Sequence, residues 1–386
     1  MKTIPYATQW INRNDILTVE KVLKSPFLTQ GPMVELFDRA IAEYCEAKYA
    51  VSVANGTAAL HIACLAAEIQ TGDEVITTPI SFVASANCIL YCGGKPVFAD
   101  VKEDTINIDP VEIEKKITSK TKAIIPVDFA GYPAECQEIW QIAKRYKLLV
   151  IEDASHALGA VYQRKKIGSG GYADMSTLSF HPVKHITTAE GGAILTNDTT
   201  FYKKILRLRT HGITRDSNDL SKNEGSWYYE MQDLGFNYRL TDMQCALGLS
   251  QLPKLNKFLQ RRREIVAQYN KAFSRYEQVR FLSPIPQTQS AHHIYVLLFK
   301  REKFSVPRKV IFEEYRRQGI LVNVHYIPIY YQPYYERLGY RKGLCPKAED
   351  YYEQAITLPL YPKMTNSQIQ RVIEITEKII TRYSKR

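Results

Sequence analysis

The sequence predicts an α/β protein with a mostly parallel sheet, followed by a smaller α+β domain. Five short apolar segments between residues 49 and 152 alternate with helical patterns, which is typical of a parallel sheet with helices on both faces. Two more strand-like segments follow, at 176–179 and 192–196. After that the alternation stops, so we expect domains at 1–245 and 246–386.

Two helices are predicted before the sheet begins. The first covers 14–24, with Asn14 or Asp15 as its cap. The spacing of the apolar residues predicts that Ile16, Val19, Val22 and Leu23 form one face of this helix. The second helix begins after the turn at 29–32 and runs to about Tyr44.

The α/β alternation then gives a regular series of elements. Strands are predicted at 49–53, 75–78, 97–101, 123–127 and 148–152. The helices between them are predicted at 57–69, 81–91, 109–117 (with Asp109 as its cap) and 134–146.

The second domain is predicted from longer helical patterns. A helical region at 241–276 is interrupted near Pro253, so the domain boundary is expected in a helix and not in a flexible linker. Strands are then expected at 294–299 and 321–324, and helices at 306–318, 347–355 and 366–383.

The composition indicates a soluble globular protein, with 45% hydrophobic and 24% charged residues among 386. No apolar run reaches the roughly 18 residues of a membrane span, and the first residues lack the apolar segment of a secretory signal. The seven cysteines contain no CxxC pair, so we expect neither a disulfide framework nor a zinc site. A reducing cytoplasm is the expected location.

The net charge of +11 is concentrated in the second half. From residue 241 onward there are 25 Lys and Arg against 12 Asp and Glu. Such a surface fits a solvated set of helices, a pocket for a phosphorylated small molecule, or a nucleic-acid contact. The basic residues are spread over several helices without a nucleic-acid motif, so we expect no nucleic-acid partner.

The residues directly after each strand are candidate ligand contacts, since ligands bind at the carboxyl ends of parallel strands. Gly56 and Thr57 open a helix after the first strand, where free N–H groups and a hydroxyl suit a phosphate. A plain helix cap is the alternative. Phe82, after the second strand, is either a stacking partner for a flat ring or a core aromatic.

After the fifth strand come Asp153 and His156. A carboxylate that ends a buried strand needs a partner, and a protonated ring nitrogen is a suitable one. His156 is placed to donate a hydrogen bond to a ring oxygen. The alternatives are a helix-capping Asp with a packed His, or a metal site, although no further ligand cluster joins them.

Lys184 lies in an unusual setting, because no charged residue occurs in the five positions before it. A desolvated lysine has a lowered pKa and becomes a nucleophile toward carbonyls. Ser179 adds a further phosphate donor. Together with Gly56, Thr57 and Asp153, these residues form the parts needed to hold pyridoxal 5′-phosphate, with Lys184 as the Schiff-base lysine.

Five motifs in this order resemble the nucleotide-sugar aminotransferases of the DegT/DnrJ/EryC1/StrS type, which are fold type I pyridoxal-phosphate enzymes. The motifs are Asn55–Leu60, Thr77–Ala84, Glu152–Gly159, Ser179–Gly192 and Gly235–Arg239. The resemblance covers essentially the whole chain. With Leu28–Gly31 and His325–Tyr330, the chain most resembles the branch that makes UDP-4-amino-4,6-dideoxy-N-acetyl-β-L-altrosamine for pseudaminic acid.

The resemblance implies a mixed, mostly parallel seven-stranded sheet between helices, with a smaller C-terminal α+β domain. It implies that Lys184 carries the cofactor, that Asp153 faces the pyridine nitrogen, and that His156 faces the ring oxygen, where many members have Gln. The other implied cofactor contacts are Phe82 on the ring, and Gly56, Thr57 and Ser179 on the phosphate.

The resemblance also implies a homodimer with shared active sites, because Asn237 reaches the phosphate from the other subunit. The positions at which relatives contact the nucleotide-sugar correspond to Tyr6, Thr29, Gln30, Arg239, His325, Tyr326 and Pro328.

The implied reaction transfers the amino group of L-glutamate to C4 of a UDP-4-keto-6-deoxy-HexNAc sugar and releases 2-oxoglutarate. Lys184 is expected to carry the proton in both half-reactions. Another nucleotide 4-keto-sugar (UDP-GlcNAc-derived, dTDP-glucose-derived or arabinose-type) remains an alternative substrate. A same-fold lyase or dehydratase and a nucleic-acid-binding regulator are also alternatives, but relatives that act as dehydratases carry His in place of the lysine.

Overall fold

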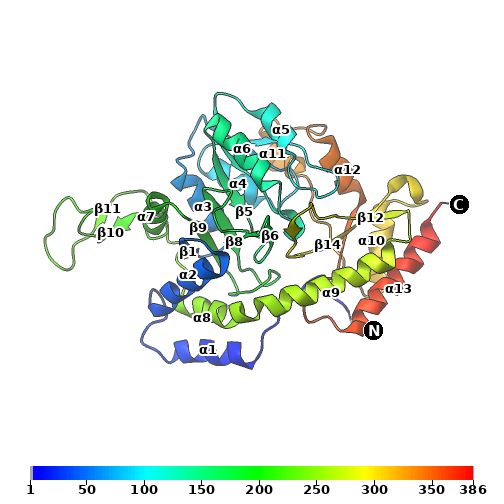
Figure 1. Ribbon diagram of the computed structural model, residues 1–386, viewed down its shortest axis with the longest axis horizontal. Coiled ribbons are helices and arrows are strands. Elements are labelled where there is room, and N and C mark those ends of the chain that lie inside the picture. Colours follow the sequence, from blue (N-terminus) through cyan, green and yellow to red (C-terminus); the bar gives the residue numbers. More distant parts are fainter. Residues whose placement is uncertain (1–2, 386) are drawn as a thin grey trace.

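The centre of the molecule is a seven-stranded mixed sheet, seen in a computed structural model that describes residues 3–385 (Figure 1). The strand order is β1-β9-β8-β5-β4-β2-β3. β9 pairs antiparallel with β1 and with β8, and the other neighbours run parallel, as the resemblance implied. The strands are β1 (Tyr49–Val53), β2 (Glu74–Thr77), β3 (Lys95–Phe98), β4 (Thr121–Ile125), β5 (Leu149–Asp153), β8 (Met175–Ser179) and β9 (Gly192–Thr196).

Helices cover both faces of this sheet. Successive strand residues enter different cores, since Val75 packs with α3 and α4 while Ile76 packs with α5 and α6. This explains why the strands read as continuous apolar runs and not as alternating ones. The helices of this part are α2 (Pro32–Cys45), α3 (Gly56–Ala66), α4 (Ala84–Tyr91), α5 (Pro110–Lys116), α6 (Cys136–Tyr146) and α7 (Thr199–Leu208).

The first helix, α1 (Arg13–Leu23), differs from the prediction in its cap and its buried face. Asn12 is the N-cap and Asp15 completes a capping box, so neither Asn14 nor Asp15 is the cap. Ile16 and Leu23 are 61% and 57% exposed, although Val22 is buried. The helix is held to α8 instead by the fully buried Asp15, whose carboxylate accepts hydrogen bonds from three side chains, those of Ser250, Gln251 and Lys254.

Two consecutive helices lead from the large sheet to a second, smaller sheet. α8 (Asp242–Gln251) and α9 (Leu255–Phe273) are joined by the short helix η2 (Leu252–Lys254), which contains Pro253 and confirms the predicted interruption. The boundary predicted at residue 245 falls inside α8 and remains a prediction. α9 runs along the lower edge of the molecule in Figure 1 toward the C-terminal helix.

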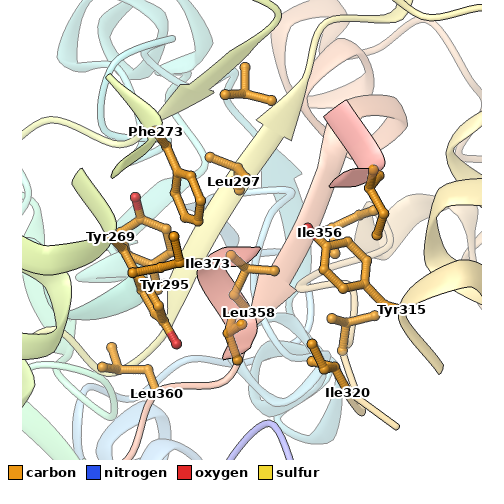
Figure 2. Packing of buried hydrophobic residues seen from close by; sticks show 14 of the residues in the cluster. Tyr269, Phe273, Tyr295, Leu297, Tyr315, Ile320, Ile356, Leu358, Leu360 and Ile373 are labelled. Carbon is orange, nitrogen blue, oxygen red and sulfur yellow. The ribbon is translucent and has the colours of Figure 1, made fainter. Parts of the chain in front are cut away.

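The smaller sheet is antiparallel, in the order β12-β14-β15 (Val279–Phe281, Tyr295–Phe299, Ala355–Leu358). Its core packs Tyr295 and Leu297 of β14 against Tyr269 and Phe273 of α9 (Figure 2). The strand predicted at 321–324 is wrong, because this segment makes only single bridges such as Asn323 with Thr357. The surrounding helices are α10 (Arg308–Arg317), α11 (Pro333–Arg337), α12 (Pro346–Gln354) and α13 (Asn366–Tyr383).

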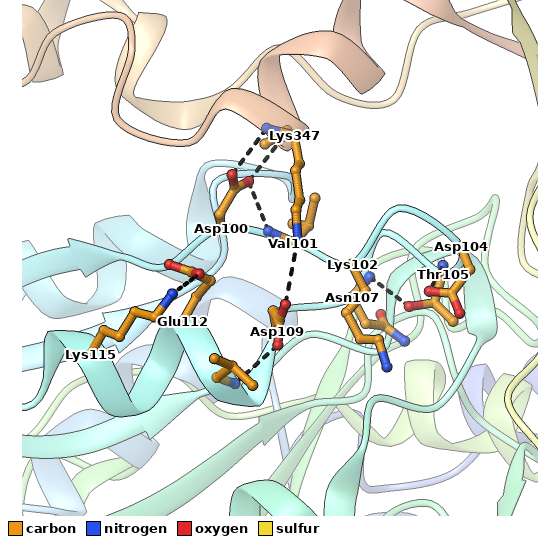
Figure 3. A network of polar contacts seen from close by, with 12 residues as sticks. Asp100, Val101, Lys102, Asp104, Thr105, Asn107, Asp109, Glu112, Lys115 and Lys347 are labelled. Carbon is orange, nitrogen blue, oxygen red and sulfur yellow. Dashed lines mark hydrogen bonds and ion pairs between the residues drawn. The ribbon is translucent and has the colours of Figure 1, made fainter.

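The large part of the molecule, which holds the seven-stranded sheet, and the small part, which holds the sheet β12-β14-β15, are joined by polar contacts as well as by the chain. α12 begins without a cap from its own preceding residue. Asp100, in the loop after β3, accepts hydrogen bonds from the backbone N–H groups of Lys347 and Ala348, both at 3.0 Å, and so caps α12 from the large part (Figure 3). The Lys347 amine also lies 3.7 Å from the Asp109 carboxylate.

Several short strands were not predicted. They are β12 and β15 of the smaller sheet, and β6 (Val161–Tyr162), β7 (Lys165–Lys166), β10 (Ile213–Thr214), β11 (Glu230–Met231) and β13 (Thr288–Gln289). The β10–β11 hairpin projects from the body of the molecule beside α7 (Figure 1). Among residues 3–385, no helix is both long and apolar enough to cross a membrane.

Candidate active site

A cavity of about 900 Å³ opens at the carboxyl ends of β1, β5 and β8. The small part closes it with residues 323–326, and the N-terminal segment contributes Tyr6. Ten residues predicted for the site line this cavity: Tyr6, Gly56, Thr57, Phe82, Asp153, His156, Ser179, Lys184, His325 and Tyr326.

The other five predicted residues do not line the cavity of their own chain. Gln30 and Arg239 lie in a separate groove of about 560 Å³. Thr29 pairs with Thr241 in an isolated bridge, and Pro328 is buried at the start of η4 (Ile329–Tyr331). Asn237 is exposed, and its approach to a partner's cofactor remains a prediction.

The start of α3 forms one end of the cavity. Asn55 caps this helix by accepting a hydrogen bond from the N–H of Ala58 at 2.8 Å. The N–H groups of Gly56 and Thr57 in the first turn have no helical partner, and the positive end of the helix dipole lies here. A Cβ on Gly56 would lie 2.9 Å from the Cβ of Ser179, so only glycine lets the two loops approach this closely.

Asp153 ends β5 and is 3% exposed. One carboxylate oxygen accepts a hydrogen bond from the hydroxyl of Ser85 at 2.6 Å, and the other accepts from the N–H of Ser155 at 3.1 Å. Each oxygen keeps a lone pair for a donor in the cavity. Asp153 is thus held in one orientation at the wall of the cavity.

Lys184 reaches the cavity from a tight turn in which its N–H donates to the carbonyl of His181 at 2.9 Å. Burial lowers the pKa of Lys184 to about 8, and the Asp153 carboxylate opposes part of that shift. Near pH 8, half of the lysines are therefore neutral, as a nucleophile or a proton carrier requires.

Buried histidines surround this lysine. Burial holds the pKa of His156, His185 and His293 well below the ordinary value, and the charge of Lys184 contributes to each shift. Burial also lowers the pKa of His325 to about 3. These imidazoles are neutral at physiological pH, so Lys184 is the titrating cation among them.

His156 packs among other rings. Its Nε2 atom is 3.3 Å from the hydroxyl of Tyr326, and the two rings are 6.1 Å apart and nearly parallel. The His293 ring centroid lies 4.3 Å away, with the two ring planes tilted by 37°. Tyr326, predicted to contact a nucleotide-sugar, contacts His156 in this structure.

His293 is a cavity residue that sequence reasoning missed. Its backbone carbonyl accepts a hydrogen bond from the buried Arg262 at 3.0 Å, and its N–H donates to the carbonyl of Ala130 at 2.8 Å. The available signal was the pair His292-His293 directly before the predicted strand at 294–299.

Phe82 is 58% exposed, and its ring lies 6.5 Å from that of Tyr326. It is therefore not a core aromatic, the alternative considered from sequence. Its exposed ring at the cavity wall is available to pack on a flat ligand.

The metal alternative gains no support at Asp153 and His156. Within residues 3–385, one group of three or more His, Cys, Asp or Glu side chains has all its possible metal-ligand atoms within 4.8 Å of one another: Asp128, Cys136 and Glu152. This group is outside the cavity lining. Burial raises the pKa of both carboxyl groups, and their mutual repulsion adds to the effect at Asp128.

Comparison with known proteins defines the class. Residues 9–377 match the model of the DegT/DnrJ/EryC1/StrS aminotransferase family, and the chain belongs to this family. Together with the cavity, this makes the protein a pyridoxal-phosphate-dependent sugar aminotransferase.

The similar curated proteins match over nearly their whole length. An uncharacterised protein of Methanocaldococcus jannaschii is 42% identical, with 96% of each chain covered. The spore coat polysaccharide biosynthesis protein SpsC of Bacillus subtilis is 38% identical, with 98% and 97% covered. The UDP-4-amino-4,6-dideoxy-N-acetyl-β-L-altrosamine transaminase of Helicobacter pylori is 38% identical, with 96% of each chain covered.

Solved structures agree with this assignment. PseC of Helicobacter pylori, an aminotransferase of pseudaminic acid biosynthesis, superimposes with a TM-score of 0.91 at 37% identity and covers 99% of this chain and 100% of its own. The sugar aminotransferase Spr1654 of Streptococcus pneumoniae in its PLP form gives a TM-score of 0.91 at 30% identity, with 98% and 99% covered.

The residues present fit the cofactor. The space that glycine leaves between Gly56 and Ser179 lies beside free N–H groups at a helix N-terminus, which suits a phosphate. Asp153 and Lys184 line the same cavity, with a carboxylate for a ring nitrogen and an amine for a carbonyl.

Proposed function

We propose that the protein transfers the amino group of L-glutamate to C4 of a UDP-4-keto-6-deoxy-HexNAc sugar and forms UDP-4-amino-4,6-dideoxy-N-acetyl-β-L-altrosamine. The observation that carries the transamination is the placement of Lys184, with its lowered pKa, in one cavity with Asp153 and the start of α3. The printed functions of the Helicobacter relatives support the choice of sugar.

In this proposal the cofactor supplies an electron sink for the substrate carbon when it is bound. Asp153 would hold the proton of the ring nitrogen, and its two donors, the Ser85 hydroxyl and the Ser155 N–H, keep it oriented. Gly56, Thr57 and Ser179 would bind the phosphate. His156 would donate to the ring oxygen, and Phe82 would pack on the ring.

Lys184 would act as the base and acid of the reaction, with its amine nitrogen taking up the proton of the substrate carbon and returning it. The neutral amine is required when the proton is taken up. A pKa of about 8 keeps a useful neutral fraction near physiological pH, whereas an ordinary lysine would be almost entirely protonated. The neutral histidines around it leave this role to Lys184.

The remaining cavity wall is proposed to bind the sugar nucleotide. Tyr6 and His325 pack against each other with ring centroids 5.5 Å apart, and both line the cavity. The net positive second half attracts the anionic diphosphate, so its charge is used without any nucleic-acid partner. We also infer that the enzyme works in the cytoplasm.

A different 4-keto-sugar is the second candidate. The Bacillus subtilis relative, SpsC, takes part in spore coat polysaccharide biosynthesis and is as similar to this chain as the Helicobacter transaminase is. A panel of UDP- and dTDP-4-keto-6-deoxy-sugars with glutamate separates the two. Amination of only the UDP-HexNAc derivative is expected, and preference for a dTDP-glucose derivative would exclude the proposed substrate.

We further propose a homodimer in which Asn237 completes the partner's site. The test mixes Lys184→Met protein, which is expected to be inactive alone, with Asn237→Ala protein, which is expected to be weakly active alone, under subunit exchange. Hybrid dimers then hold one intact site, so about a quarter of wild-type activity is expected for an equal random mixture. If dimers shown to contain one subunit of each variant recover no activity, Lys184 and Asn237 belong to the site of the same chain.

A further inference from the structure

Two serines form a hydrogen-bonded chain behind Asp153. The hydroxyl of Ser85 lies 2.6 Å from a carboxylate oxygen of Asp153, and the hydroxyl of Ser81 lies 2.8 Å from that of Ser85. Ser81 is 4% and Ser85 1% exposed. Both residues also border the cavity, so the chain runs along its wall from the β2–α4 loop to the end of β5.

The direction of these hydrogen bonds follows from the chemistry of the groups. A carboxylate only accepts, so Ser85 must donate its single hydroxyl proton to Asp153. Ser85 then has no second proton, so the contact between the serines is donated by Ser81. Each donation polarises the next hydroxyl, which strengthens the bond to the carboxylate.

We propose that Ser85, supported by Ser81, is a positioning residue that sets the orientation of Asp153 for the cofactor's ring nitrogen. Ser85 and the N–H of Ser155 each hold one carboxylate oxygen, which fixes the plane of the group and leaves the cavity side open.

This inference rests on the proposed role of Asp153 and does not depend on the identity of the sugar. A carboxylate held on one side only can rotate, and it then meets the ring nitrogen in the right geometry for a smaller part of the time. Removing the Ser85 hydroxyl also leaves a buried carboxylate oxygen without its donor. Both effects weaken the binding of the cofactor.

The test measures the dissociation constant of pyridoxal 5′-phosphate from cofactor-free protein by absorbance titration. Ser85→Ala is expected to weaken binding roughly ten-fold, because a hydrogen bond to a charged group is lost. Ser81→Ala, which keeps the direct bond, is expected to weaken it roughly three-fold. Ser85→Thr retains the hydroxyl and is expected to restore binding.

Ser176→Ala is the matched control. Ser176 is a buried serine at the neighbouring strand β8 and donates to the Glu152 carboxylate at 2.7 Å, a bond of the same kind outside the cavity lining. Its removal is expected to leave cofactor affinity unchanged. A ten-fold loss in this variant would show that any buried serine-to-carboxylate bond in the sheet has the same effect, and would overturn the inference.

A double-mutant cycle with Asp153→Asn completes the test. If Ser85 acts through Asp153, Ser85→Ala has no further effect in the Asp153→Asn protein, whereas additive losses would overturn the inference. Wild-type affinity in Asp153→Asn would refute the proposed role of Asp153 itself, and the inference with it. Thermal unfolding of each cofactor-free variant checks the fold, and Ser81→Ala replaces Ser85→Ala should the latter not fold.

Discussion

Lys184→Met is expected to make the cofactor-free protein more stable at neutral pH while it abolishes transamination. The wild-type protein holds a buried amine whose pKa falls from 10.5 to about 8 on folding, so folding is opposed whenever the amine is protonated. Methionine has a similar length, no charge and no need for hydration. It therefore removes that cost and fills the same space.

The magnitude follows from linkage between protonation and folding. At pH 7 the lysine is protonated in both states, and the shift of the pKa corresponds to at most about 3 kcal/mol, since water in the cavity reduces it. Between pH 8 and 10.5 the unfolded chain holds more protons than the folded one, so wild-type stability rises with pH. The advantage of the variant then falls to about 1 kcal/mol at pH 10.

The assay is urea unfolding of both cofactor-free proteins at pH 7 and pH 10, with the difference taken at each pH so that other titrating groups cancel. Lys309→Met, at an exposed lysine in the first turn of α10, is the control and should change stability little at either pH. A destabilised Lys184→Met protein, or a difference that stays constant with pH, would refute the claim that burial lowers the pKa of Lys184.

Three further outcomes are expected from single substitutions. Gly56→Ala places a Cβ 2.9 Å from that of Ser179 and should weaken cofactor binding at least about ten-fold. Inorganic phosphate should also no longer stabilise the cofactor-free protein. Unchanged cofactor binding would exclude a phosphate at this turn. Arg262→Met removes the guanidinium group, whose Nη1 atom shares its two N–H donors among three backbone carbonyls, and should lower the free energy of unfolding by about 2 kcal/mol, measured by urea titration. An unchanged free energy of unfolding would mean that the cost of desolvating the guanidinium cancels those hydrogen bonds. Asp15→Asn breaks the buried ion pair with Lys254 and should cost about 3 kcal/mol and expose α1 to proteolysis; an α1 that stays protected would show that apolar contacts hold it.

Much of the large part was predictable because its elements have local causes. The buried parallel strands are short apolar runs, and the helices between them begin at recognisable caps such as Asn55 and Asp109. The two-residue strands of the β10–β11 hairpin are too short to show a period, so no pattern of apolar residues predicts them. The segment at 321–324 is apolar enough for a strand but lacks a neighbour to pair with continuously.

Some residues of the candidate site could likewise be predicted from sequence to lie together, and others could not. Gly56, Asp153, Ser179 and Lys184 were placed together from sequence, because parallel strands end at one edge of a sheet and each of these residues lies at or beyond a strand end. Gln30 and Arg239 belong to the same family motifs but lie in a different groove of the single chain. Their order along the chain carried no information about which surface they share.

The sequence by itself thus determined which chemical groups this protein carries: a lysine without charged neighbours before it, a carboxylate at a strand end and a glycine turn at a helix start, for which we propose phosphate binding. Only the tertiary structure decided the surroundings of those groups. The ring contact of His156 with His293 and the donation from Ser85 to Asp153 join residues 137 and 68 positions apart. The physical reason is that a motif records local backbone geometry, whereas desolvation and hydrogen-bond orientation arise from packing between distant segments.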